Sequence, residues 1–94
     1  MIVTVDEVKV HLRIQQDEED AYLAGLVVQA QAAAEDFCRV LFTEPAPEPV
    51  RLAVLLMVGH CYENRDTPDR EAYLTMRMAF ENLLYPYRDL TLML

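Results

Sequence analysis

One segment, residues 52–62, constrains the fold of this chain more than any other. It reads Leu-Ala-Val-Leu-Leu-Met-Val-Gly-His-Cys-Tyr and is apolar almost all the way around a helical wheel. A helix that is hydrophobic on every side needs neighbours on every side. The segment is also far shorter than the roughly 20 apolar residues that cross a bilayer. The sequence therefore predicts either the central helix of a small bundle or a helix that partly faces another subunit.

The length and charge of the chain limit its fold and its partners. Its 94 residues suffice for one helical domain, 1–94, whose stability margin is thin unless oligomerisation adds to it. Sixteen acidic and eight basic residues give a net charge of −8, and most of the acidic excess lies in residues 1–48. Because nucleic-acid-binding surfaces are basic, this chain does not collect phosphates by bulk charge. An acidic surface could still surround DNA without adhering to it.

The start of the chain does not resemble a secretion signal, and its two cysteines, Cys38 and Cys61, fall in predicted helices. We expect both to be buried free thiols in a reducing compartment. The expected location is the cytoplasm.

Capping patterns and hydrophobic periodicity predict the first two helices. Thr4 and Glu7 have the spacing of a capping box, so a short helix should begin after Thr4 and end near residues 13–14. The longest helix is expected at about 17–41, with Asp17 as a candidate cap and acids in the first turn, where the helix dipole favours them. Its apolar stripe comprises Leu23, Leu26, Val27, Ala30, Ala34, Phe37 and Leu41.

Prolines mark the boundaries of the remaining helices. A proline-rich connector, residues 43–49, should exclude helix and lead into the apolar helix at about 49–64, with Pro49 as its first residue. Thr67 and Pro68 are the predicted cap and first residue of the last helix. The fold class is therefore all-α, a small bundle of about four helices. The apolar stripe of the last helix comprises Tyr73, Met76, Phe80, Leu83 and Leu84.

Residues 86–94 form an apolar tail after the helix-stopping Pro86. Water would surround its large side chains unless another surface covers them. Two arrangements remain open: the tail folds back onto its own domain, or it docks on a neighbour as a strand or short helix. The apolar tail residues are Leu90, Leu92, Met93 and Leu94.

The sequence contains no pattern typical of an enzyme: no glycine-rich phosphate loop, Cys-x-x-Cys, His-Glu-x-x-His or nucleophile elbow. A zinc site drawn from His11, Cys38, His60 and Cys61 would require a tertiary coincidence, because adjacent residues diverge by about 100° on a helix. The acidic clusters are typical of solvated faces and helix caps. We therefore predict no enzyme and no catalytic, cofactor-binding or metal-binding residue.

Arginine dominates the basic residues, since Lys9 is the single lysine. Guanidinium groups make bidentate, partly desolvated contacts and are favoured in interfaces. Arg65, Arg77 and Arg88 each lie near acids in the sequence. They could contact an acidic face of the next subunit, or they could pair within the chain.

Four segments, taken in order, carry a family resemblance. They are residues 4–14, which end a short helix in Leu-Arg; the acidic turn 17–23 before an alanine-rich stretch; His-Cys-Tyr-Glu-Asn-Arg at 60–65; and Leu-Leu-Tyr-Pro-Tyr-Arg at 83–88. Together they resemble the small head–tail connector (adaptor) proteins of long-tailed double-stranded DNA phages, often labelled "possible DNA packaging protein". Many relatives have a longer, glycine-containing insertion after Glu-Asn-Arg, whereas residues 66–69 are short here.

The resemblance implies a structural virion protein that forms a ring between portal and tail, with roughly a dozen copies joined by heterologous contacts. It would complete the head after DNA packaging, bind the portal and a downstream head-completion or tail protein, and let DNA pass without sequence-specific binding. It would occupy the host cytoplasm during assembly and then the head–tail junction of the virion, with no membrane.

Residues on both sides of such a contact can be nominated from the acidic turn, the arginines and the tail. The candidate interface residues are Asp17, Glu18, Asp20, Arg65, Arg77, Arg88, Leu90, Leu92, Met93 and Leu94.

A different class of function remains as the alternative: a small acidic regulatory or antitoxin-like module that binds a partner protein as a dimer.

Overall fold

The structure is a computed structural model that describes residues 1–89. It contains α1 (Val5–Leu12), α2 (Asp20–Cys38), α3 (Glu48–Glu63) and α4 (Arg70–Leu84), followed by a short 3-10 turn, η1 (Tyr85–Tyr87). No strand occurs within residues 1–89. The prediction of a small all-α bundle is confirmed.

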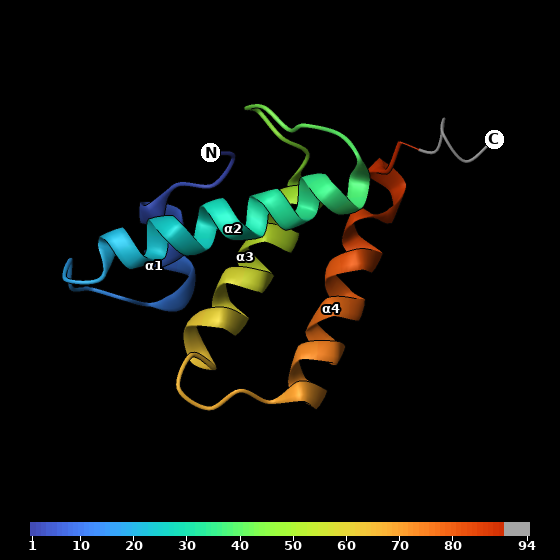
Figure 1. The fold of residues 1–94 in the computed structure, drawn as a ribbon. Helices are drawn as coiled ribbons and strands as arrows, with labels where there is room; N and C mark the ends of the chain where they lie inside the picture. The colour runs from blue at the N-terminus through green and yellow to red at the C-terminus, as the bar shows by residue number, and fades with distance from the viewer. Residues whose placement is uncertain (90–94) are drawn as a thin grey trace.

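The four helices form a flat assembly around α3. In Figure 1, α2 crosses one end of α3 and α4, which run in opposite directions, and α1 lies behind α2. α3 contacts each of the other three helices, whereas α2 and α4 meet over a small area only. The Cα atoms span 47 × 31 × 17 Å. The thin dimension means that most helices keep one broad face in solvent.

The apolar segment is the central helix of the bundle, which is one of the two arrangements that the sequence left open. Its buried residues are spread around most of its circumference, although Leu52 is 43% exposed. At Gly59 a methyl group would lie 3.3 Å from Leu12 Cδ2, so glycine lets α1 pack closely against α3. The buried residues of α3 are Val50, Ala53, Val54, Leu55, Met57, Val58 and Gly59.

The predicted capping box at the start of α1 is confirmed. The Glu7 backbone N–H donates to Thr4 Oγ1 at 3.1 Å, and the Thr4 N–H donates to Glu7 Oε1 at 3.1 Å. α1 and α2 end in the same way, with Arg13 (φ 60°) and Arg39 (φ 59°) in the left-handed conformation.

The predicted bounds of the longest helix were too wide. α2 begins at Asp20 rather than Asp17, and Asp17 does not cap it. The side chains of Asp17 and Glu19 are instead bound to other helices, which holds residues 17–19 outside the helix. At the other end, left-handed Arg39 stops the helix, so Leu41 lies beyond the apolar stripe and is 81% exposed.

The starts of α3 and α4 also differ from the prediction. α3 begins at Glu48, so residues 48–49 of the proline-rich connector form its first turn and Pro49 is its second residue. α4 is capped by Asp69, whose Oδ1 accepts the Ala72 N–H at 3.1 Å, and not by Thr67. The carboxylate of Asp69 supplies the acceptor that Thr67 was expected to provide, two residues further along. Of the predicted stripe on α4, Met76, Phe80 and Leu84 are buried.

Candidate functional site

The acidic turn before α2 is fastened to α1 by a single lysine. Lys9 Nζ forms an ion pair with Asp17 and another, at 3.0 Å, with Asp20. The hydrogen bonds with Asp17 and Asp20 raise the pKa of Lys9, and the hydrogen bond with Lys9 lowers the pKa of the Asp17 carboxyl. Glu18, between them, is exposed and makes no ion pair within residues 1–89. Two of the three nominated acids therefore already have a partner in their own chain.

Arg65 joins the end of α3 to the start of α2. Its guanidinium pairs with Glu19 and lies 4.8 Å from the ring centroid of Tyr62 and 5.4 Å from that of Tyr22. Tyr62 Oη donates to Glu19 Oε1 at 2.6 Å. The hydrogen bonds from Tyr62 and then Arg65 lower the pKa of Glu19, and the bond to Glu19 raises the pKa of Tyr62. The Tyr-Glu-Asn-Arg segment thus locks two helices together.

The other two nominated arginines are bound near the opposite end of α2. Arg77 Nε donates to Glu81 at 2.8 Å, and its guanidinium lies 4.9 Å from the Phe80 ring centroid. Arg88 Nε donates to the Phe37 carbonyl at 3.1 Å, and its guanidinium lies 4.7 Å from the Phe37 ring centroid. Intrachain pairing with an acid, one of the two interpretations left open by the sequence, is therefore seen for Arg65 and Arg77, while Arg88 is bonded within the chain to a backbone carbonyl. A role in a subunit contact stays a prediction for each of them.

Two polar junctions have now been described: Lys9 with Asp17 and Asp20, and Arg65 with Glu19 and Tyr62. They depend on three residues that sequence reasoning did not nominate, namely Lys9, Glu19 and Tyr62. Lys9 could have been found as the only lysine, eight positions before the acidic turn. Glu19 is one of four consecutive acids, and no local pattern distinguishes it from its neighbours.

The tail residues Leu90, Leu92, Met93 and Leu94 lie outside the described part of the chain. The segment leading to them is held at the C-terminal end of α2, where the Asp89 N–H donates to the Cys38 carbonyl at 2.8 Å. The start of the tail is therefore fixed in position.

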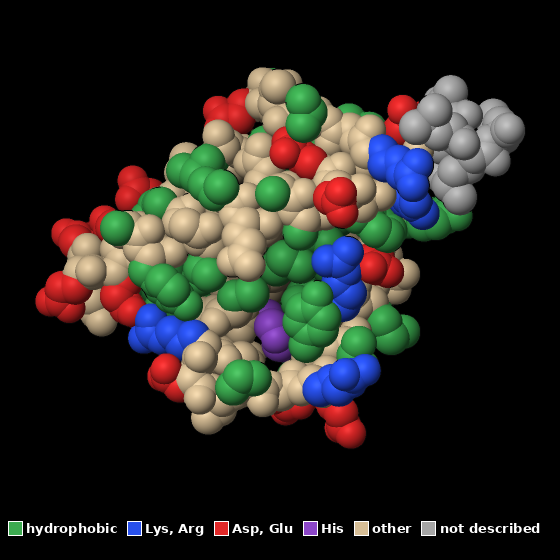
Figure 2. Space-filling model, viewed as in Figure 1, with side chains coloured by type: hydrophobic (Ala, Val, Ile, Leu, Met, Phe, Trp, Pro, Cys, Tyr) green, Lys and Arg blue, Asp and Glu red, His purple; other side chains and the backbone are tan. Residues whose placement is uncertain are grey.

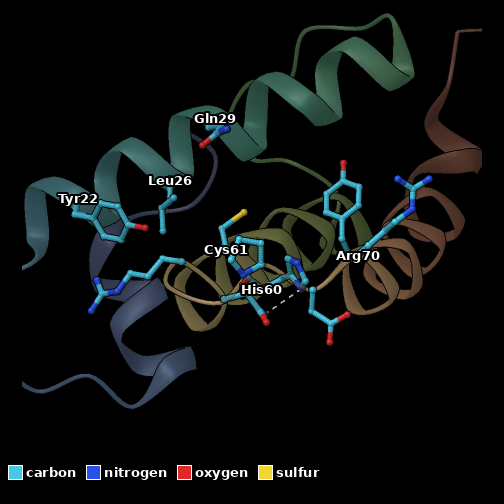
Figure 3. Close-up of a pocket in the computed structure, with 11 residues that line it drawn as sticks. Tyr22, Leu26, Gln29, His60, Cys61 and Arg70 are labelled. Atoms are coloured by element: carbon cyan, nitrogen blue, oxygen red, sulfur yellow. Dashed lines mark hydrogen bonds between the residues drawn. The ribbon is translucent and has the colours of Figure 1, made fainter.

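A cleft of about 620 Å³ opens where α2, α3 and the start of α4 diverge. Figure 3 shows Tyr22 and Leu26 extending from α2 toward Cys61 on α3, with His60 beneath and Arg70 on the α4 side. The cleft is present because α2 and α4 make little direct contact above α3. In Figure 2, hydrophobic side chains gather below α2 on this face, with basic side chains beside them.

A narrower hollow of about 160 Å³ continues the cleft between α2 and α4 and shares several of its lining residues. It adds Ala30, Ala33, Met57 and Arg77 to the lining. At the far rim of the cleft, Arg70 makes no ion pair within residues 1–89. The cleft is lined largely by apolar and aromatic side chains, and its rim carries Arg65, Arg70 and the acid Asp69.

An exposed apolar stripe runs along α4 and continues to Tyr85 at the start of η1. Leu74, Met78 and Tyr85 follow one another at intervals that place them on one face, and Met78 is 68% exposed.

Within residues 1–89, no group of three or more His, Cys, Asp or Glu side chains is arranged to hold a metal ion. Cys38 and Cys61 are both free thiols, but only Cys38 is fully buried. Over the same described range, no helix has the length and apolar character needed to cross a membrane.

A comparison with protein families matches residues 2–90 to a family described as phage gp6-like head-tail connector protein. Comparison with curated proteins and with solved structures gives no match.

Proposed function

Because the chain belongs to the family of phage gp6-like head-tail connector proteins, we propose that it forms a ring between the portal and the tail. As a member of this family it is a structural component of a phage virion, at the junction of head and tail. The proposal adds the closed ring, the portal below the capsid vertex as one partner, and a downstream head-completion or tail protein as the other. In this scheme the ring assembles in the host cytoplasm and completes the head after packaging.

The family match over residues 2–90 is the observation that carries the proposal. It favours the connector over the dimeric regulatory module, and it describes a structural protein rather than an enzyme. The whole of residues 1–94 would act as one connector domain, with residues 86–94 as its tail.

The surface of the subunit supports assembly through unlike patches. The α4 stripe of Leu74, Met78 and Tyr85 offers apolar contact area, and the cleft between α2 and α4 offers a second, different surface. A ring requires a heterologous contact, in which one patch meets a different patch on the next copy. Arg65 and Arg77, beside the cleft, are already paired with Glu19 and Glu81, so they present a fixed geometry to a neighbour.

The net charge of −8 suits a channel for DNA. Like charge suppresses adhesion between the protein and the phosphate backbone, so DNA can slide through a ring of such subunits. This passage would not depend on nucleotide sequence.

The proposal is tested by the mass of the purified protein, measured by light scattering over a concentration series, alone and with its portal protein. We expect a closed species of many copies that forms alone or on the portal. A stable dimer that ignores the portal would refute the ring.

A matched pair of substitutions on α4 tests the proposed contact surface. Met78→Asp places a charge on the exposed apolar stripe, whereas Thr75→Asp places the same charge on an exposed polar position of the same helix. We expect only Met78→Asp to prevent assembly, with both variants remaining helical by circular dichroism. Equal assembly of the two variants would remove the α4 stripe from the interface.

A further inference from the structure

Residues 66–75, which join α3 to α4 and form the first turns of α4, lie outside the hydrophobic core. Within residues 1–89, none of their side chains is buried and none packs against the buried cluster. Over the same range their side chains make one hydrogen bond, in which Asp69 accepts from the Ala72 N–H inside the segment. One ring contact reaches α3, where Tyr73 meets His60 edge-on with the ring centroids 5.9 Å apart. Side-chain contacts therefore do little to hold this segment in place.

Exposure alone does not distinguish the segment. Residues 9–22 also contain no buried side chain, but Lys9 pairs with Asp17 and Asp20 and so fastens that connection at both ends. Residues 66–75 make no ion pair with any part of the chain that the structure describes. They are therefore exposed and also unfastened.

The chain on either side of the segment is fixed. Before it, Arg65 pairs with Glu19 and its guanidinium lies over the ring of Tyr62. After it, Met76 is the first buried residue of α4 and is 5% exposed. A loosely held segment between two fixed points can move only by swinging about those points.

The segment forms one wall of the cleft beside Cys61. Figure 3 shows Arg70 on the α4 side and Gln29 on α2, with Cys61 on the helix between them. Tyr73 also lines the narrower hollow between α2 and α4. The cleft-lining residues of the segment are Pro68, Asp69, Arg70 and Tyr73.

The C-terminal half of α4 is attached much more firmly. Phe80 and Leu84 are fully buried, and the Cys38 thiol donates to the Leu84 carbonyl at 3.7 Å. Segments with few buried apolar contacts open locally at a lower free energy than the core does. A helical turn that is not packed is also weak, because its few hydrogen bonds barely offset the ordering of its backbone. Residues 66–75 should therefore open while residues 76–84 stay folded.

We propose that residues 66–75 form a strap, which swings open between Arg65 and Met76 and controls access to the cleft beside Cys61. In the closed position the strap narrows the cleft. In the open position it uncovers the hollow between α2 and α4, so a partner that fills the hollow has to displace the strap. The strap is a property of the single subunit and does not depend on the proposed ring.

Amide hydrogen exchange tests the strap, measured by NMR on the full-length protein at a concentration where it is monomeric. Asp69→Ala removes the cap of α4, and its loss should increase the open population about fivefold. The Tyr73 and Thr75 amides should exchange faster by the same factor, while the Phe80 amide keeps its wild-type rate. Asp69→Asn keeps an oxygen that can cap the helix, so it should behave like the wild type.

The Cys61 thiol reports on access to the cleft. A bulky maleimide should label Cys61 about fivefold faster in Asp69→Ala, because the reagent enters when the strap is open. Thr4→Ala is the matched control, since it removes the cap of α1, where Thr4 Oγ1 accepts the Glu7 N–H at 3.1 Å. It should leave both the labelling of Cys61 and the exchange of the Tyr73 amide at their wild-type rates.

Each possible result either supports the strap or overturns it. If Asp69→Ala speeds the Tyr73 and Phe80 amides equally, α4 opens as a whole and the strap is wrong. Faster amide exchange without faster labelling of Cys61 would mean that the helix frays without opening the cleft, which also overturns the proposal. Equal acceleration by Thr4→Ala would assign the opening to global unfolding. None of these results bears on the ring, which the mass measurements test separately.

Discussion

Replacing Leu55 with alanine should destabilise the fold by about 3 kcal/mol, whereas the same change at Leu52 should cost about 1 kcal/mol. Both leucines lie on α3, so the two substitutions change helix propensity equally. They differ in burial, because Leu55 is 9% exposed and Leu52 is 43% exposed. The comparison therefore tests whether α3 is the centre of the bundle and which side of it is open.

The magnitudes follow from the buried area and the space left behind. A buried methylene contributes about 0.8 kcal/mol, and the change removes three carbons, so the transfer cost at Leu55 is about 2.4 kcal/mol. Leu12 and Met76 line the same hollow as Leu55 and would leave a residual void, which raises the total to about 3 kcal/mol. At Leu52 solvent fills the vacated space, so no void term is added.

The assay is urea unfolding followed by circular dichroism, at a concentration where light scattering shows a monomer. Thermal unfolding gives a second measure. In a domain of this size each kcal/mol moves the thermal midpoint by about 5 °C, so Leu55→Ala should lose about 15 °C and Leu52→Ala about 5 °C. The slope of the urea transition should be unchanged. Equal losses at the two positions, or a larger loss at Leu52, would refute the assignment of α3 as a helix with one open side.

Three further results are expected. The Glu19 carboxylate has a lowered pKa, so it stabilises the fold above its ordinary pKa of 4.5 and that contribution disappears as the pH falls through the lowered value. The urea midpoint of Glu19→Gln should therefore lie below that of the wild type at neutral pH and converge with it in acid. Glu18→Gln, the control, should match the wild type at every pH. Parallel plots of urea midpoint against pH for the wild type and Glu19→Gln would contradict this. A thiol reagent should label Cys61 in the folded protein and Cys38 only after unfolding, as mass spectrometry would show; equal rates would place both thiols at the surface. Truncation after Asp89 should leave the helical circular dichroism signal intact and abolish assembly, and unchanged assembly would exclude the tail.

The sequence predicts the helices well where local chemistry decides them. The capping box of Thr4 and Glu7 and the all-round apolar character of residues 52–62 both place their helices correctly, because the signal and the structure lie in the same few residues. The end of α2 was missed because Arg39 takes the left-handed conformation. Glycine is the usual residue there, so its absence removed the sequence signal for the end of the helix.

The polar junctions were less predictable, because their partners are distant in sequence. Glu19 and Arg65 are both charged residues in solvent-facing segments, and only the fold brings them together with Tyr62. The sequence correctly raised intrachain pairing for Arg65 but offered no means of choosing its acid among four consecutive candidates. The cleft beside Cys61 was not predicted for the same reason, since it is formed by the divergence of three helices.

The left-handed ends of α1 and α2 show that this subunit does not use all the stability open to it. Arg13 and Arg39 hold φ values of 60° and 59°, where a side chain with a Cβ is disfavoured and glycine is not. Each turn therefore carries a conformational cost of about 1 kcal/mol that a glycine would relieve. Glycine at these two exposed turns should therefore raise the free energy of unfolding, and the change disturbs neither the apolar core nor the cleft.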